Sequence, residues 1–295
     1  MFFNEIYADD VLIKDRLYKA VSATYIIEQL NHLSSQEKQQ LRLVFKKHST
    51  VFDGQLGCHP TANIHIELKP DSQPVWQKPY PVALQRKQQF NNEHTSMVYD
   101  GVLVKIGRSE WGFPSFVIPK KDMRVRWVSD FRKLNEMIVR KPFPMPKISD
   151  ILMERQEYSH FTKMDLSMMF YFFKLDKEIQ DICVISTEHG CYAYTRLPMG
   201  VKISPDVAQQ HMMEILQGIP NTSCYIDDVG IWTKGTFPEH INVVDTFLER
   251  FSNNNMKCNP LKYDWEVQET DFLGFCITPK GVKPCSKRIE PILAM

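Results

Sequence analysis

Apolar residues recur every three or four positions in five stretches of the chain, which is the spacing of one helix face. Ser34 and Glu37 have the spacing of a capping box, so they predict the start of the first helix. Gly101 and Gly218 stand where a left-handed residue commonly closes a helix. The pattern predicts helices within residues 34–48, 82–100, 142–156, 203–218 and 240–255.

Alternating apolar and polar positions predict several strands. Residues 115–131 are typical of two strands joined by a charged turn at residues 120–122. Residues 160–166 predict a strand that ends at Asp165, and residues 271–282 predict a strand pair. Together with the helices, these strands indicate an α+β fold in which helices cover one face of a mainly antiparallel sheet.

Residues 58–81 begin with an alternation at Ile64, Ile66 and Leu68, and four prolines follow it. Proline cannot donate a backbone hydrogen bond to a neighbouring strand. We therefore expect this segment to cross a surface in an extended form without building a core.

The stretch CYIDDVGIW, residues 224–232, places Asp227 and Asp228 between two apolar runs. Two turn-forming residues between apolar runs predict a β-hairpin. The same pair suits a metal site, because hard divalent cations bind carboxylate oxygens held close together. The two interpretations are compatible, since a hairpin tip is a rigid support for metal ligands.

The composition argues against several classes of protein. Hydrophobic residues make up 43% and charged residues 24% of the chain, which is ordinary for a globular protein. No apolar run approaches the roughly 20 residues that span a bilayer, and the acidic N-terminus is unlike a signal peptide. Seven cysteines without any C-x-x-C pair indicate a reducing compartment and no zinc site.

The net charge is +1, but basic residues gather in one region. Residues 105–147 contain eleven Lys and Arg against four Asp and Glu, which leaves a net charge of +7. Such a block is typical of a surface that binds phosphates, although a solvated basic face explains it equally well. Aromatic residues interleave with these charges and indicate a folded surface: Trp111, Phe113, Phe116, Trp127 and Phe131.

Asp165 and the pair Asp227–Asp228 are candidate metal ligands if their strands are neighbours. Three clustered carboxylates repel one another unless cations lie between them. Two Mg²⁺ ions about 4 Å apart, bridged by such carboxylates, are the usual site of in-line phosphoryl transfer. Lys120, Lys121 and Arg126 would then bind the phosphates. The sequence contains no Walker A loop, G-x-S-x-G elbow or H-E-x-x-H helix that would indicate another chemistry.

Six motifs occur in the order found in reverse transcriptases of gypsy-type LTR retrotransposons: VRWVSDFRKLN, KPFPMPKISDIL, FTKMDL, RLPMGVKISPDVAQQ, YIDD and FLGF. Two upstream stretches, HIELKPDSQPVWQKPYPVA and GVLVKIGRSEWGFPSFVIPKKD, resemble that family's lead-in and fingers. The likeness runs from about Val51 to Ile292. The chain therefore resembles the reverse transcriptase domain of a gypsy-type retrotransposon Pol polyprotein.

The resemblance implies a role for each matching position. Asp165 and Asp227 would be direct metal ligands, with Asp228 as the supporting third carboxylate. Phe170 would exclude a ribose 2′-hydroxyl, although the run MMFYFF is equally typical of a core. The residues implied to bind the incoming nucleotide are Lys120, Arg126, Phe170, Met199 and Gly200.

Further roles follow from the same resemblance. Lys262 is a candidate general acid that would protonate the leaving pyrophosphate, and a plain phosphate contact or a solvated lysine explains it about as well. Arg132 would contact the template. Phe272, Leu273 and Gly274 resemble the hairpin that grips the primer end.

The resemblance also implies a right-hand polymerase fold of fingers and palm, with the thumb largely absent. It assigns residues 1–50 to a partly helical lead-in, 51–160 to the fingers and the start of the palm, and 161–255 to the palm. Residues 256–295 would hold the end of the palm, the primer-grip hairpin and the start of a connection to the thumb.

The implied activity is RNA-directed and DNA-directed DNA polymerisation. Its partners would be dNTPs and a primed RNA or DNA template, without a membrane. Its cofactors would be two Mg²⁺ ions, which Mn²⁺ can replace. The implied location is intracellular: the cytoplasm, a virus-like particle or the nucleus.

Two features depart from the family's pattern. Met169 stands where many relatives have glycine, in the turn that faces the triphosphate, and the chain ends at Met295, before a thumb or an RNase H domain. We therefore expect a weakly processive polymerase at best, because phosphate contacts supply much of the affinity for a template-primer. The alternative is a truncated or domesticated nucleic-acid-binding remnant.

Overall fold

The computed structural model describes residues 23–119, 125–153, 157–166 and 168–284, which form two compact units. Among them, the first unit takes residues 56–142 and 168–208, and the second takes residues 23–55, 143–166 and 209–284. Each unit therefore combines segments that lie far apart in the sequence. Among the described residues, no helix is long and apolar enough to cross a membrane.

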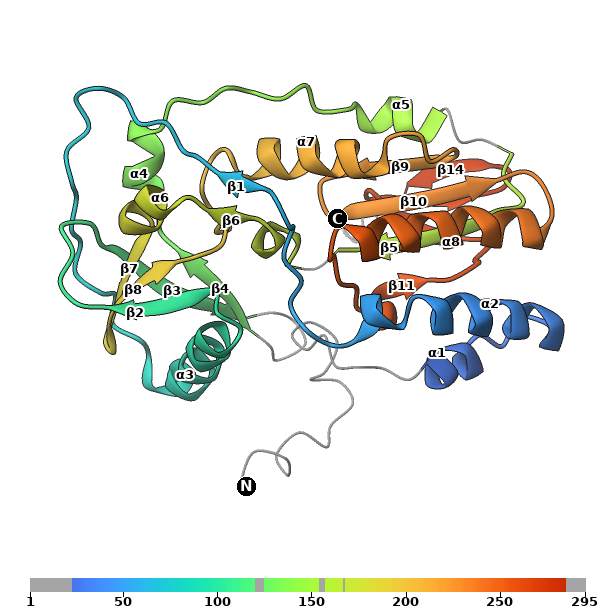
Figure 1. The fold of residues 1–295 in the computed structure, drawn as a ribbon, viewed down its shortest axis with the longest axis horizontal. Helices are drawn as coiled ribbons and strands as arrows, with labels where there is room; N and C mark the ends of the chain where they lie inside the picture. Colours follow the sequence, from blue (N-terminus) through green and yellow to red (C-terminus); the bar gives the residue numbers. More distant parts are fainter. Residues whose placement is uncertain (1–22, 120–124, 154–156, 167, 285–295) are drawn as a thin grey trace, which may run out of the picture. The chain divides into compact units, whose positions relative to one another are not determined.

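The first unit is built on a five-stranded sheet, in which β3 and β7 run parallel and the other neighbours run antiparallel. Its strand order is β2 (Leu103–Ile106), β8 (Gly190–Tyr194), β7 (Val184–Thr187), β3 (Phe113–Pro119) and β4 (Val125–Ser129). Helix α3 (Leu84–Tyr99) lies against this sheet and contacts β2, β3 and β4 (Figure 1). Shorter elements of this unit are α4 (Arg132–Met137), α6 (Lys177–Ile182), a 3₁₀ helix (Met169–Phe172), and the parallel pair β1 (Asn63–Ile64) and β6 (Lys174–Leu175).

The expectation that residues 58–81 build no core is wrong for the start of this segment. Ile64 and Ile66 are only 5% and 3% exposed. They are buried because β1 pairs with β6, which places the alternating side chains against the first unit. The prolines that follow did not exclude this short pairing, since they lie beyond it.

The second unit contains a four-stranded antiparallel sheet in the order β11 (Tyr263–Asp264), β5 (His160–Asp165), β10 (Asp228–Thr233) and β9 (Thr222–Tyr225). Helix α8 (Phe237–Asn253) contacts β10, and α2 (Ser35–Lys47) lies beside α8 (Figure 1). The two helices are joined at Asp245, which accepts a hydrogen bond from Lys47 Nζ at 2.6 Å.

The second unit also holds a small antiparallel sheet and several short elements. The small sheet consists of β12 (Thr270–Phe272), β13 (Phe275–Thr278) and β14 (Gly281–Pro284). The other elements are α1 (Ala23–Gln29), α5 (Ile148–Met153) and 3₁₀ turns at Ser49–Phe52 and Pro260–Lys262. Helix α7 (Ser204–Leu216) begins in the first unit and ends in the second.

The predicted helix boundaries agree with the structure at most positions. Ser34 and Glu37 form the capping box of α2, and Gly101 and Gly218 have the left-handed φ values of +67° and +81°. Helix α8 begins earlier than predicted, because Thr236 forms a capping box with a glutamate three residues later. The predicted antiparallel sheet covered by helices is found as the four-stranded sheet beside α8, and the described residues contain three further sheets. The predicted charged turn at residues 120–122 lies outside the described residues.

Alternation along β5 and β10 gives the four-stranded sheet two different faces. One face carries Thr162 and Ile231 toward α8, and the other carries Phe161 and Trp232, whose rings stack 5.0 Å apart. Gly230 is required on that second face, because a Cβ atom there would lie 2.7 Å from the Trp232 ring.

Helix α8 presents the buried His240 to the first of these faces. Its ring nitrogens lie 2.8 Å from Thr162 Oγ1 and 3.0 Å from Thr233 Oγ1. The Glu266 carboxylate lies 3.5 Å from His240 and also binds His160. Burial lowers the pKa of His240 to about 3, with a smaller contribution from His160, and burial raises the pKa of Glu266 to about 6.

We expect the free energy of unfolding to fall as the pH is lowered from about 4.5 towards 3, because the unfolded chain has protonated His240 in this range and the folded protein has not. One such proton contributes a slope of about 1.4 kcal/mol per pH unit. Glu266 opposes it between about pH 4.5 and 6, where the folded state holds the extra proton. Urea unfolding between about pH 4.5 and 3 should show a smaller loss in His240→Gln, and equal slopes would contradict the assignment.

Candidate active site

The antiparallel register of β5 and β10 brings two carboxylates together. Asp228, the first residue of β10, lies directly opposite Asp165, the last residue of β5. Directly opposite residues share one face of a sheet, so both side chains lie on the face that carries Phe161. Asp227 immediately precedes β10 and is exposed. The predicted hairpin and the predicted neighbourhood of these strands are therefore confirmed.

The turn that carries Asp227 is short and attached to the end of β5. Tyr225 pairs with Asp228, so the two residues of the turn are Ile226 and Asp227, one position earlier than the predicted pair Asp227–Asp228. The Asp227 carbonyl accepts a hydrogen bond of 2.8 Å from the backbone N–H of Leu166. This bond joins the turn to the residue that follows Asp165.

The carboxylates repel one another in a partly dry environment. Burial and, to a lesser extent, the charges of Asp227 and Asp165 raise the pKa of Asp228 to about 6, whereas Lys163 acts in the opposite direction. The Lys262 Nζ atom lies 3.9 Å from Asp165 Oδ1. A cation near these carboxylates would therefore remove an unfavourable interaction that two lysines offset only in part.

The donor chemistry of this cluster fits a hard divalent cation, which prefers carboxylate oxygens. As the side chains stand, however, no three His, Cys, Asp or Glu side chains in the described part of the chain are arranged to hold a metal ion. The backbone register is in place, and the Asp165, Asp227 and Asp228 side chains would have to rotate to share a cation.

The β12–β13 hairpin packs against the sheet face that carries the carboxylates. The ring of Phe272 is 1% exposed and meets Phe161 and Trp232 edge-on, at centroid distances of 5.7 and 5.5 Å. Leu273 and Gly274 form the turn, with φ values of +50° and +80°. Phe272 therefore anchors the hairpin, and Leu273 in the turn also packs, partly buried, against the cluster that contains Phe161, Trp232 and Phe272.

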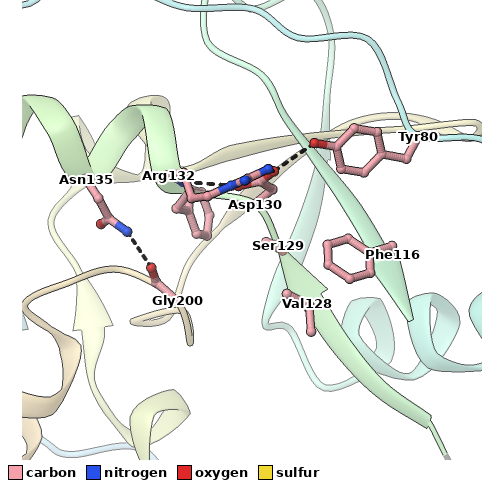
Figure 2. Close-up of a pocket in the computed structure, with 9 residues that line it drawn as sticks. Tyr80, Phe116, Val128, Ser129, Asp130, Arg132, Asn135 and Gly200 are labelled. Atoms are coloured by element: carbon pink, nitrogen blue, oxygen red, sulfur yellow. Dashed lines mark hydrogen bonds and ion pairs between the residues drawn. The ribbon is translucent and has the colours of Figure 1, made fainter. Parts of the chain in front are cut away.

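The first unit contains an open cavity of about 580 Å³ beside the β3–β4 pair. Figure 2 shows Asp130 between Tyr80 and Arg132 at its edge. The Tyr80 hydroxyl donates to Asp130 at 2.8 Å, and the Arg132 Nε and Nη2 atoms donate to the two Asp130 oxygens at 2.8 and 2.6 Å. The Arg132 guanidinium beside Asp130 holds the pKa of that carboxyl well below its usual range. The cavity is lined by Tyr80, Phe116, Val128, Ser129, Asp130, Phe131, Arg132, Asn135 and Gly200.

The LPMG loop meets this cavity at Gly200. The Gly200 carbonyl accepts a 2.8 Å hydrogen bond from the Asn135 side-chain amide (Figure 2). The Asn135 side-chain oxygen accepts a hydrogen bond of 2.8 Å from the backbone N–H of Lys202. Gly200 has a φ of +96°, and a Cβ atom there would lie 3.2 Å from the Ser129 carbonyl oxygen. Asn135 therefore fixes the loop, and glycine is required at position 200, next to the exposed Met199.

The other nucleotide-binding candidates differ in exposure. Arg126 is exposed on β4 and lies on the same strand face as Val128, two residues from the cavity. Phe170 is partly exposed within a run of buried neighbours: Met169 at 1%, Tyr171 at 3%, Phe172 at 0% and Phe173 at 0%. Lys120 lies outside the described residues.

The basic block of residues 105–147 is partly neutralised. Of the eight cations of this block that the structure describes, four have carboxylate partners: Arg132 with Asp130, Lys133 with Glu136, Arg140 with Asp206 and Lys141 with Glu67. Among these four pairs, Asp206 is the carboxylate least accessible to solvent, because its side chain is 4% exposed.

Residues 118–277 match the profile of the family described as reverse transcriptase (RNA-dependent DNA polymerase), which is more than half of the chain. The chain belongs to the reverse transcriptase family. Within the second unit, the structure brings Asp165, Asp227, Asp228 and Lys262 together. Arg132 and Gly200 meet at one cavity of the first unit.

Curated relatives of this reverse transcriptase domain are retrotransposon polyproteins. The Pol polyprotein from transposon 297 of Drosophila melanogaster is 28% identical over 90% of this chain, and that from transposon 412 is 30% identical over 86%. The Tf2-7 polyprotein of Schizosaccharomyces pombe is 26% identical over 77%. The chain spans only 26%, 21% and 17% of these relatives.

Solved reverse transcriptases share the fold. The foamy viral protease-reverse transcriptase solved with double-stranded DNA superposes with a TM-score of 0.84 at 24% identity, over 92% of this chain and 48% of that one. The foamy viral enzyme solved with an RNA/DNA hybrid gives a TM-score of 0.82 over 92% of this chain and 37% of that one. The chain therefore has the α+β fold of polymerase fingers and palm.

Three residues of the reverse transcriptase domain that support these sites were not predicted. Asn135 holds Gly200, Lys163 donates to the Asp271 carbonyl at 2.8 Å, and Gln209 contacts the YIDD strand. Each binds backbone atoms distant in sequence, and no spacing rule indicates such contacts. For Gln209 alone, the sequence offers a partial indication of its role, because the residue lies in the predicted helix that directly precedes the YIDD hairpin.

We expect Asp228→Asn to raise the free energy of unfolding by about 1–3 kcal/mol at pH 8 in the presence of EDTA. The folded protein disfavours the ionised Asp228 carboxylate, so above about pH 6 the unfolded state gains from ionisation. Urea unfolding measures the change, with the exposed Asp71→Asn as a control that should change little. A destabilised Asp228→Asn would contradict the repulsion described above.

Proposed function

We propose that this chain carries the catalytic part of an RNA-directed DNA polymerase that also copies DNA templates. It would transfer nucleotides from dNTPs to a primer 3′-hydroxyl. The observation that carries the proposal is the register that sets Asp165 opposite Asp228, with Asp227 in the adjoining turn, in a member of the reverse transcriptase family. In this proposal residues 51–160 form the fingers and the start of the palm, and residues 161–255 form the palm.

In this proposal Asp165 and Asp227 hold two Mg²⁺ ions, which Mn²⁺ can replace, and Asp228 is the supporting carboxylate. When bound, the ions would lower the pKa of the attacking hydroxyl and stabilise the charge of the triphosphate and the leaving pyrophosphate. Lys262 lies 3.9 Å from Asp165 and is 14% exposed, which suits a general acid that protonates the pyrophosphate.

The nucleotide would be bound from the fingers. Arg126 presents an exposed guanidinium that can donate two hydrogen bonds to the triphosphate, and Lys120 would add a second cation. Phe170 would lie against the sugar and exclude a 2′-hydroxyl, which its partial exposure within a buried run supports. Met199 and Gly200 would line the pocket. The buried position of Met169 supports a nucleotide site that this bulky side chain does not enter.

The template and primer would contact other surfaces. The cavity beside Arg132 has apolar walls at Phe116 and Val128, which suit a base or a sugar of the template. The turn at Leu273–Gly274 would contact the primer end, with Phe272 as its anchor. Foamy viral relatives of the same fold were solved with double-stranded DNA and with an RNA/DNA hybrid, which supports a nucleic-acid partner here.

Primer extension tests the proposal. The 295-residue chain should extend an oligo(dT) primer on poly(rA) with dTTP and Mg²⁺, and Asp227→Asn should reduce the rate by at least about 100-fold. The exposed Asp71→Asn is the matched control and should extend like the wild type. If the wild-type chain binds the template but extends no primer, the proposed polymerase activity is refuted. The alternative, a nucleic-acid-binding remnant, would then be favoured.

A separate prediction concerns Arg126. We expect Arg126→Gln to raise the KM for dTTP by about 10-fold or more, because a charge-assisted hydrogen bond to phosphate is lost. The affinity for the primer-template should change much less. Arg86→Gln is the matched control, since Arg86 binds Gln89 on its own helix. An unchanged KM in Arg126→Gln would remove Arg126 from the nucleotide site.

A further inference from the structure

The YIDD turn contains a residue in an unfavourable backbone conformation. Ile226 has a φ of +53°, in the left-handed region, and it is β-branched. A β-branched residue in this region is a genuine outlier, because its side chain clashes with its own backbone there. Such a conformation persists only where surrounding contacts hold it. The next residue is Asp227, so the conformation of Ile226 sets the direction of that carboxylate.

One side chain from α7 binds this turn. The Gln209 Oε1 atom accepts a 2.6 Å hydrogen bond from the backbone N–H of Ile226. Its Nε2 atom donates to the Cys224 carbonyl at 3.1 Å. A single amide therefore holds the strand end before the turn and the first residue of the turn.

The burial of Gln209 makes these bonds costly to lose. The residue is 0% exposed, so neither its amide nor the Ile226 N–H can exchange its partner for bulk water without local opening. A buried glutamine is uncommon, and one whose acceptor and donor both meet the same hairpin is a specific geometric arrangement.

We infer that Gln209 is a positioning residue, which holds Ile226 in its left-handed conformation and thereby directs Asp227 toward Asp165. The inference rests on the proposed polymerase function. On the opposite side of the turn, the Leu166 N–H holds the Asp227 carbonyl at 2.8 Å. The two peptide groups of the turn are thus held from two elements, α7 and the end of β5.

The decisive experiment is a double-mutant cycle on primer extension with oligo(dT), poly(rA), dTTP and Mg²⁺. Gln209→Met keeps an unbranched side chain of similar length and removes both hydrogen-bonding atoms. We expect it to lower kcat by about 10- to 100-fold while the KM for dTTP changes by less than about threefold, because a small misplacement of a catalytic group mainly slows the reaction step.

Glycine adopts a positive φ without the steric cost that isoleucine carries. In an Ile226→Gly background, Gln209→Met should therefore lower kcat by less than about threefold. A merely structural role for Gln209 would give the same loss in both backgrounds. Gln210→Met is the matched control, because Gln210 is exposed on the same helix and donates to Glu214. It should retain the wild-type kcat.

Amide hydrogen exchange supplies a readout that does not depend on activity. The Ile226 N–H should lose at least about tenfold protection in Gln209→Met, whereas the Val229 N–H within β10 should keep its protection. If the wild-type chain extends no primer, the proposed function fails and the exchange measurement still decides the inference. An unchanged Ile226 exchange rate, an unchanged kcat in an active enzyme, or equal losses in the two backgrounds would each overturn it.

Discussion

The antiparallel pairing of β5 with β10 is the constraint on which the rest of the second unit depends. In a strand, a slip of one residue moves every side chain to the other face. Such a slip would turn Asp228 toward α8, and it would place Ile231 on the sheet face that Phe272 covers. Both faces are packed, by His240 on one side and by Phe272 on the other, so the register is specified twice. The position of the carboxylates follows from that packing.

Local signals predicted the elements well. The capping box at Ser34, the closing glycines, the alternation before Asp165 and the two-residue hairpin all depend on contacts within a few residues, and each is found in the structure. The approach of Asp165 to Asp227–Asp228 was also predictable, because the sequence shows Asp165 at the end of one strand and the Asp pair at the hairpin of another. Thr236 and Glu239 have the same capping-box spacing, and they place the start of α8 before the predicted residue 240.

Non-local features could not be predicted in the same way. Residues 168–208 return to the first unit after the chain has built β5 in the second, and no composition change marks that return. Ile64 becomes buried only because β6, more than 100 residues later, pairs beside it. Asn135, Lys163 and Gln209 bind backbone atoms of distant segments, so their roles become visible only when the folded chain brings those atoms together.

The neutralised cations of the basic block change what its charge means for nucleic-acid recognition. An arginine that is already paired with a carboxylate neutralises a phosphate less fully, so it releases fewer of the counterions condensed on the nucleic acid. In the proposed template contact, the Arg132 guanidinium, bound to both Asp130 oxygens, would instead offer an oriented plane against which a base or sugar can stack. Nucleic-acid recognition beside Arg132 would then depend on shape and stacking. Release of the counterions condensed on the duplex would come mainly from contacts with other cations of the protein.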